Sequence, residues 1–297
     1  MKEYVLENYN PQVLLENTEL VSDLYDEYGV VIFPNFFKED ELFKRYIDDL
    51  NWVFDEIISK HTDSLIPKDL GDKLVLLNAL NAVDGKIITN LGTQPNKFGS
   101  FNQIKFSSYI NALLKQIYKE DSILSTPQAG DTLHFFPPGK KFFKYNLPPH
   151  QDYQYLMQSP EQITFYLGLS SYKESVGGLR LWEKSHKLGI LPTTTNEFGS
   201  FEVLESESVL KDYDSFDYEW NVGDFGFFDS LISHSSIPNV SSDSGRIVQI
   251  FRFCNLNNSV AKSYDFKSCV YDRECILFSD VHASKICKWI LETITQS

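Results

Sequence analysis

Cysteine is scarce in this sequence, and its placement excludes the commonest cysteine-based sites. The 297 residues include four cysteines, and all lie beyond residue 253: Cys254, Cys269, Cys275 and Cys287. No two have the Cys-x-x-Cys spacing that is typical of zinc ribbons and thiol–disulfide redox motifs. Cys269 and Cys275 could bind a metal or form a disulfide, but we interpret them as unpaired thiols of a reduced protein.

Positive charge is also in short supply. The chain has 27 Lys and Arg residues against 41 Asp and Glu residues, which gives a formal net charge of −14. An acidic protein has no general attraction for phosphate backbones. We therefore expect no nucleic-acid partner.

Long apolar stretches are missing as well. No run approaches the roughly 18 residues that a membrane span requires. The first ten residues, MKEYVLENYN, have neither the basic region nor the apolar region of a secretory signal. We therefore expect a cytoplasmic protein with no membrane contact.

What is present divides the chain into parts of different character. Up to about residue 125, apolar residues recur at helical spacing over residues 11–28, Lys38–His61 and Asn102–Lys119. The run GVVIFP at residues 29–34 interrupts this pattern and predicts a short buried strand that ends at Pro34. The first part is therefore predicted to be mainly helical.

From about residue 126 to 255 the pattern changes to short apolar runs between turn residues. Several short strands of this kind favour a sandwich or a barrel, with the helices packed against one face. A C-terminal extension, 256–297, ends in a predicted helix near Ser284–Ile294, and the absence of a linker predicts one domain over residues 1–297. The predicted strands are Thr132–Phe136, Ile163–Leu169, Leu179–Trp182, Phe225–Phe228 and Ile247–Phe253.

His150, Asp152 and His234 are the candidate metal ligands. In His150-Gln151-Asp152 the imidazole and the carboxylate stand at i and i+2, which an extended strand points to the same face. Such a pair is common by chance, so it needs another ligand. His234 supplies one, and two histidines with one carboxylate leave positions of an octahedral Fe(II) ion open for co-substrate and dioxygen.

Arg246 is the candidate anion-binding residue because it begins an apolar strand. A buried guanidinium can bind a carboxylate in a two-pronged geometry. It would hold the far end of a dicarboxylic co-substrate whose keto-acid end chelates the iron. The plainer alternatives are a solvated pair for His150 and Asp152, a structural role for His234, and a structural ion pair for Arg246.

The ordered set of motifs resembles the phytanoyl-CoA dioxygenase family of Fe(II)/2-oxoglutarate oxygenases. The matching segments are YGVVIFPNFFKEDEL at residues 28–42, the His150-Gln151-Asp152 motif, GGLRLWEKSHKLG at 177–189, and residues 234–246. The resemblance implies a mainly β fold with flanking helices, in which a double-stranded β-helix (jelly-roll) core is buttressed by N-terminal helices.

The same resemblance implies the roles of the site residues and the reaction. His150, Asp152 and His234 would be the catalytic iron ligands, while Arg246 and Ser236 would bind 2-oxoglutarate. With Fe(II), 2-oxoglutarate and O2, the enzyme would hydroxylate a C–H bond of a small-molecule substrate and release succinate and CO2. Desaturation, cyclisation and epoxidation use the same iron chemistry, and the sequence does not choose among them.

The chain also departs from the family. Glu183-Lys184 precede Ser185-His186 where the family often has Pro-Gly, so the turn there is built differently. Family halogenases replace the metal-binding carboxylate by a small residue, and Asp152 therefore disfavours halogenation. Two alternatives of other classes stay open: a non-catalytic metal-binding jelly roll that senses a ligand, and a zinc-dependent hydrolase.

Other features are open to two interpretations each. His134 is interpreted as a core histidine, with a place in the pocket lining as the alternative, and His186 as a turn residue or a residue that supports the metal ligands. Lys140, Lys141 and Lys144 are interpreted as a solvated basic cluster, with binding of an anionic substrate as the alternative. The acidic, aromatic segment 212–220 is either a lid or a loop packed on the barrel. The substrate and the oligomeric state are left open.

Overall fold

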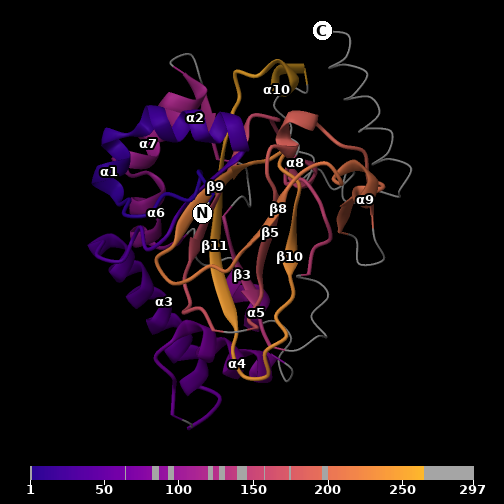
Figure 1. Cartoon of the computed structure of the whole chain (residues 1–297). Coiled ribbons are helices and arrows are strands. Elements are labelled where there is room, and N and C mark those ends of the chain that lie inside the picture. The colour runs from indigo at the N-terminus through magenta and orange to yellow at the C-terminus, as the bar shows by residue number, and fades with distance from the viewer. Residues whose placement is uncertain are drawn as a thin grey trace.

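The centre of the computed structural model is a six-stranded antiparallel sheet (Figure 1). The structure describes residues 2–63, 65–81, 87–92, 97–119, 123–126, 131–138, 146–156, 158–173, 175–195 and 200–263. Neighbouring strands follow the order β1-β9-β4-β11-β2, and β3 also pairs with β11. The strands are β1 (Val30–Phe33), β2 (Leu124–Ser125), β3 (Thr132–Phe136), β4 (Gln162–Gly168), β9 (Phe225–Asp229) and β11 (Arg246–Asn255).

A three-stranded sheet packs against the inner face of the large one. Its order is β10-β5-β8, and an apolar cluster shared by both sheets includes Tyr166, Phe228 and Val248 with Leu179 and Leu181. Two facing antiparallel sheets around one core form a jelly roll. The predicted fold, mainly β with a double-stranded β-helix core, is therefore confirmed. The remaining strands are β5 (Gly178–Trp182), β8 (Ser215–Tyr218), β10 (His234–Ile237) and the separate pair β6 (Thr193–Thr195) and β7 (Phe201–Val203).

The N-terminal helices cover the outer face of the large sheet, to the left in Figure 1. In α3 every third or fourth residue is buried, namely Phe43, Tyr46, Leu50, Phe54 and Ile58. This stripe belongs to the same cluster as the outward-facing side chains of the large sheet. The longer helices are α1 (Pro11–Glu16), α2 (Thr18–Tyr28), α3 (Glu41–Ser59), α4 (Leu70–Asn81), α5 (Ile87–Gly92), α6 (Gly99–Lys105) and α7 (Ser108–Tyr118).

Alternate side chains of strand β11 point toward the helices and toward the barrel interior. Phe251 packs in the outer cluster, and the side-chain oxygen of Gln249 accepts a hydrogen bond from the Tyr46 hydroxyl of α3 at 2.6 Å. Val248 and Ile250 pack in the inner cluster. Side chains alternate between the two faces of a strand, so Arg246 and Arg252 share the inner face with Val248 and Ile250.

The helical spacing of residues 11–28 is confirmed, as two helices that meet at Asn17. Two predictions about other single elements were wrong. The segment 102–119 is not one helix but parts of α6 and α7, which are separated at Phe106 and Ser107. The segment 212–220 is neither a lid nor a loop, because residues 215–218 form strand β8 of the small sheet. Its polar residues suit an edge strand, which pairs on one side only.

Some predictions fall on residues that the structure does not describe. Lys140, Lys141, Lys144, the predicted helix at Ser284–Ile294 and the three cysteines beyond Cys254 lie outside the described residues. Among the residues that are described, no helix is both long and apolar enough to cross a membrane.

Candidate metal centre

His150 and His234 are held side by side by their backbones. The two residues form an isolated antiparallel bridge, in which the His150 amide donates to the His234 carbonyl at 2.9 Å and the His234 amide donates to the His150 carbonyl at 3.0 Å. Their ring centroids are 4.1 Å apart. Two imidazoles from distant parts of the sequence therefore meet through peptide pairing.

Asp152 reaches the same point in a different way from the one predicted. It lies in the turn before the short helix α8 (Tyr153–Leu156), not on an extended strand. Its Oδ1 atom is 3.7 Å from Nε2 of His150 and 3.5 Å from Nε2 of His234. The spacing argument predicted the right convergence, but the turn at residue 152 produces it.

The three donor groups form a buried cluster of the size that one ion requires. Their candidate ligand atoms lie within 4.8 Å of one another. His150, Asp152 and His234 are 2%, 4% and 5% exposed. Ligand atoms about 2.0–2.2 Å from one ion are at most about 4.4 Å apart, and the two Nε2–Oδ1 distances of 3.7 and 3.5 Å meet that limit.

The other nitrogen of each imidazole faces a backbone carbonyl. Nδ1 of His150 lies 2.8 Å from the Pro148 oxygen, and Nδ1 of His234 lies 3.1 Å from the Ile232 oxygen. A carbonyl only accepts hydrogen bonds, so each Nδ1 carries the proton. The Nε2 lone pairs are then free to bind a metal, and the rings are fixed in that orientation.

Asp152 is held from behind by two residues that sequence reasoning missed. Its Oδ2 atom accepts hydrogen bonds from the Thr164 hydroxyl at 2.6 Å and from Nη2 and Nε of Arg252 at 2.8 and 3.2 Å. Burial alone would raise the pKa of Asp152, but the Arg252 guanidinium and the two imidazoles hold it well below its usual range. The carboxylate is therefore charged and ready to bind a cation.

Gln151, the middle residue of the motif, joins the loops around the centre. Its side-chain nitrogen donates to the carbonyls of Gly189 and Leu231 at 2.8 and 2.6 Å. Its side-chain oxygen accepts from the Leu191 amide and the Gln154 side chain, both at 2.9 Å. The ligand-bearing segment is thus tied to two other loops.

Arg246 is a buried cation whose guanidinium makes no hydrogen bond or ion pair with any residue that the structure describes. It is 1% exposed, and within the described residues Nε, Nη1 and Nη2 all lack a hydrogen-bond acceptor. Its guanidinium lies over the Phe136 ring, 3.9 Å from the centroid, and burial lowers its pKa. An unpaired buried charge is costly, so this position is suited to an anion that arrives as a ligand. The residues present therefore fit both a divalent metal and a carboxylate co-substrate.

The comparisons with known proteins agree with this arrangement. A family model for phytanoyl-CoA dioxygenase (PhyH) matches residues 25–248. The chain belongs to the phytanoyl-CoA dioxygenase family. The family is one of dioxygenases, and with the His-Asp-His cluster this makes the protein an Fe(II)/2-oxoglutarate-dependent oxygenase, as predicted.

Solved structures with the same fold include two enzymes of nogalamycin biosynthesis. The epimerase SnoN, in complex with Fe3+, alpha ketoglutarate and nogalamycin RO, is 13% identical, with a TM-score of 0.53 over 84% of this chain and 89% of that chain. The alpha ketoglutarate-dependent carbocyclase SnoK is 13% identical, with a TM-score of 0.51 over 81% and 85%. At 13% identity, the structural similarity to SnoN and SnoK shows only that this member of the dioxygenase family has the same fold. A comparison with the curated proteins gives no match.

The remaining histidines near the barrel of this dioxygenase differ in their surroundings. His134 lies on β3 opposite Val248, and burial together with the charges of Arg252 and Arg246 lowers its pKa to about 4. It therefore faces the candidate site rather than a separate core. His186 lies outside the barrel, where its Nε2 atom is 3.2 Å from the Asp26 carbonyl, in agreement with a turn residue.

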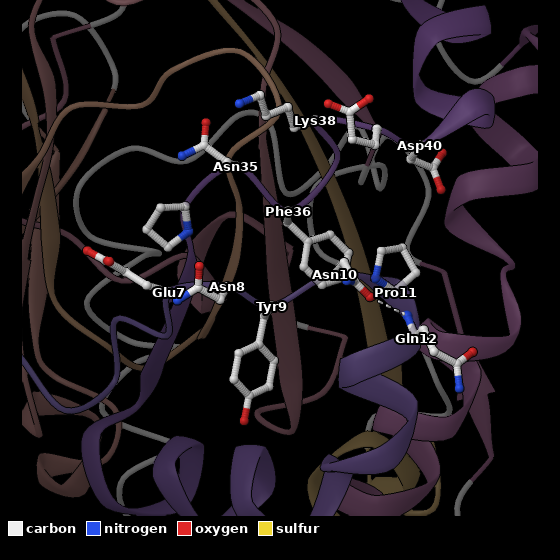
Figure 2. Close-up of a pocket in the computed structure, with 12 residues that line it drawn as sticks. Glu7, Asn8, Tyr9, Asn10, Pro11, Gln12, Asn35, Phe36, Lys38 and Asp40 are labelled. Carbon is white, nitrogen blue, oxygen red and sulfur yellow. Dashed lines mark hydrogen bonds between the residues drawn. The ribbon is translucent and has the colours of Figure 1, made fainter.

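A cavity of about 740 Å³ lies apart from the candidate metal centre (Figure 2). Residues 7–12 and segment 34–40 line it, and within the first segment the Asn10 side chain accepts a hydrogen bond from the Gln12 amide. None of the candidate site residues lines this cavity. It is therefore not the place where we expect the family chemistry.

Proposed function

We propose that His150, Asp152 and His234 hold one Fe(II) ion, that Arg246 and Ser236 bind 2-oxoglutarate, and that the enzyme hydroxylates a small molecule. The observation that carries this proposal is the convergence of three ligand groups in one barrel with an unpaired guanidinium. Two histidines and one carboxylate are the ligand set of non-haem Fe(II) oxygenases. Bound iron with 2-oxoglutarate supplies the oxidation, in which R–H, O2 and 2-oxoglutarate become R–OH, succinate and CO2.

The protein residues have separate tasks in this scheme. The carbonyls behind His150 and His234 orient both Nε2 atoms toward the metal. Arg246 forms a charged hydrogen-bonded pair with the distal carboxylate of 2-oxoglutarate. Ser236 stands two residues after His234 on β10, and is therefore on the same face of the strand, with a partly buried side chain. Its hydroxyl would add a hydrogen bond to that carboxylate.

The unpaired Arg246 also favours an oxygenase over the two alternatives. A metal-binding sensor or a zinc hydrolase has no dicarboxylic co-substrate, so its barrel would retain a buried charge without a partner. Such a charge is destabilising unless a ligand compensates it. In an oxygenase, the distal carboxylate of 2-oxoglutarate would pair with the Arg246 guanidinium in each catalytic cycle.

The proposal is tested with purified protein under anaerobic conditions. Addition of Fe(II) and 2-oxoglutarate should produce the visible charge-transfer absorption of a chelated keto acid, and admission of air should release succinate and CO2 in equal amounts. Asp152→Ala should abolish both signals, whereas the exposed-pair variant Asp217→Ala should retain them. A protein that binds no Fe(II) and never consumes 2-oxoglutarate contradicts the proposal.

The alternatives give different results in the same assay. A sensor would bind Fe(II) without consuming 2-oxoglutarate. A hydrolase would be active with Zn(II) in the absence of oxygen. The hydroxylation itself is tested by oxygen-18 incorporation from O2 into the product once a substrate is found by screening small molecules.

We further propose that the protein acts in the cytoplasm as a single domain with no nucleic-acid or membrane partner. The formal net charge of −14 and the low cysteine content support this setting. Fractionation of cells that produce the tagged protein tests the location, and limited proteolysis tests the single domain. A stable proteolytic fragment that lacks the helical part (up to about residue 125) or the jelly-roll core (about 126–255) would contradict the single domain.

A further inference from the structure

Arg252 makes an unusual pair with the candidate metal ligand Asp152. Two of its nitrogens, Nε and Nη2, donate to the same carboxylate oxygen, Oδ2, at 3.2 and 2.8 Å. The Thr164 hydroxyl donates to that oxygen too, at 2.6 Å. Three hydrogen bonds therefore converge on Oδ2, while Oδ1 faces the two imidazoles.

A second arginine–aspartate pair in the same molecule shows the ordinary geometry. Nε of Arg180 donates to Oδ1 of Asp217 at 2.6 Å, and Nη2 donates to Oδ2 at 2.8 Å. This two-pronged arrangement uses both carboxylate oxygens. In Arg252 the same two nitrogens both donate to Oδ2 of Asp152, and neither donates to Oδ1. Arg252 is therefore placed to bind one carboxylate oxygen only.

The sheet fixes this selection. Thr164 of β4 and Arg252 of β11 are direct partners across the two strands. Nε of Arg252 also lies 3.2 Å from the Thr164 hydroxyl, and Arg252 and Asp152 are 9% and 4% exposed. The two donors are held by neighbouring backbones inside the barrel, where hydrogen bonds to a charged group are strong.

We propose that Arg252, with Thr164, is a positioning residue that restricts Asp152 to binding the metal through Oδ1 alone. This inference rests on the proposed iron site. Three single-atom ligands occupy three of the six positions of an octahedral ion and leave three open. A carboxylate that bound through both oxygens would occupy a fourth and compete with the keto-acid chelate of 2-oxoglutarate. Arg252 therefore preserves room for the co-substrate.

The proposal predicts opposite changes in two affinities. In Arg252→Met, Oδ2 keeps only the hydrogen bond from Thr164 and a nearby positive charge is removed, so affinity for a divalent cation should be unchanged or higher. Affinity for 2-oxoglutarate at saturating metal should fall on the order of 10-fold to 100-fold, the size that outer-shell mutations typically have on metal affinity or activity. A role in folding alone would lower both affinities together.

The experiment titrates Mn(II), and then 2-oxoglutarate at saturating Mn(II), into the full chain by calorimetry. The Fe(II)·2-oxoglutarate charge-transfer band is recorded anaerobically in parallel. Arg252→Met and Thr164→Val are compared with the conservative Arg252→Lys and Thr164→Ser, and with Arg180→Met as the matched control for loss of an arginine–aspartate pair. We expect weakened 2-oxoglutarate binding and a shifted band in Arg252→Met, a smaller change in Thr164→Val, and partial or full rescue in the conservative variants.

Parental 2-oxoglutarate affinity and an unshifted band in Arg252→Met overturn the inference, and so does a parallel loss of both affinities. If Arg252→Met does not fold, Arg252→Lys and Thr164→Val decide, and parental behaviour of both overturns it. Failure of the parent itself to bind metal and 2-oxoglutarate is a separate result, because it removes the proposed iron site and not only the role of Arg252.

Discussion

Two arginines on the inner face of one strand have opposite surroundings. Arg252 of β11 donates to Asp152 through two nitrogens, whereas none of the nitrogens of Arg246 has an acceptor in the part of the chain that the structure describes. Both side chains are buried. A folded protein retains an unpaired buried cation only at a cost. The charge of Arg252 is therefore paired within the protein, whereas a bound anion would pair the charge of Arg246.

Breaking the complete pair should have the largest effect. Asp152→Ala removes the carboxylate and leaves Arg252 buried without it, so we expect a loss of about 3–5 kcal/mol in the free energy of unfolding. Metal binding should be lost as well. Chemical denaturation measures the first effect and Mn(II) calorimetry the second. Asp217→Ala, at the exposed Arg180 pair, should cost less than about 1 kcal/mol; an equal cost at both pairs would refute the contrast.

Removing the unpaired cation should have the reverse effect on stability. Arg246→Met eliminates a buried charge that lacks an acceptor, so the ligand-free protein should be more stable by about 1–3 kcal/mol. Binding of 2-oxoglutarate should weaken by at least about 30-fold, because truncating one partner of a buried hydrogen-bonded charge pair costs about 2–5 kcal/mol. Thermal unfolding and 2-oxoglutarate titration test the two parts. A destabilised Arg246→Met variant would show that this residue has a structural partner.

The two arginines also act together on His134. Burial and both guanidinium charges lower the pKa of His134 to about 4, below its value of about 6.5 in an unfolded chain. The unfolded chain then binds more protons between these values. Stability from this residue is therefore fully present above pH 6.5 and is lost as the pH falls toward 4.

His134→Asn should reduce the slope of unfolding free energy against pH in that window by up to about one proton. Denaturant titrations of the metal-free protein at a series of pH values measure it. An unchanged slope would mean that the arginine charges do not reach the imidazole.

The smallest expected effect concerns the ring beneath Arg246. Phe136→Leu removes the cation–π contact, which contributes about 0.5–2 kcal/mol, and should weaken 2-oxoglutarate binding by roughly 2-fold to 30-fold at saturating metal. Phe135→Leu is the control, since its side chain packs in the outer cluster against the helices. Equal losses of 2-oxoglutarate affinity in the two variants would remove any special role of Phe136.

The same contrast explains which elements could be predicted from the sequence. The strands with apolar runs, β1, β3, β4, β5, β9 and β11, were predicted because strands that are largely buried require apolar residues. Strands β8 (SFDY) and β10 (HSSI) were not, because polar residues interrupt the apolar pattern. Helix α4 was missed since its apolar residues are not confined to one side.

The candidate site was predicted only in part for a related reason. His150, Asp152 and His234 have a recognisable spacing, and Arg246 stands at the start of an apolar strand. Arg252 stands six residues after Arg246, and this even spacing places both on the same face of the strand. That spacing was the feature of the sequence that could have identified Arg252. Its partner Thr164 depends on the register between β4 and β11, and a single sequence does not specify that register.

The backbone bridge between His150 and His234 has a consequence for assembly. Because peptide pairing sets the spacing of these imidazoles, the coordination sphere is completed only when two distant stretches of chain have docked. A metal bound to both imidazoles would therefore stabilise the docked arrangement of these two stretches, and a chelator should accelerate unfolding of the holoenzyme.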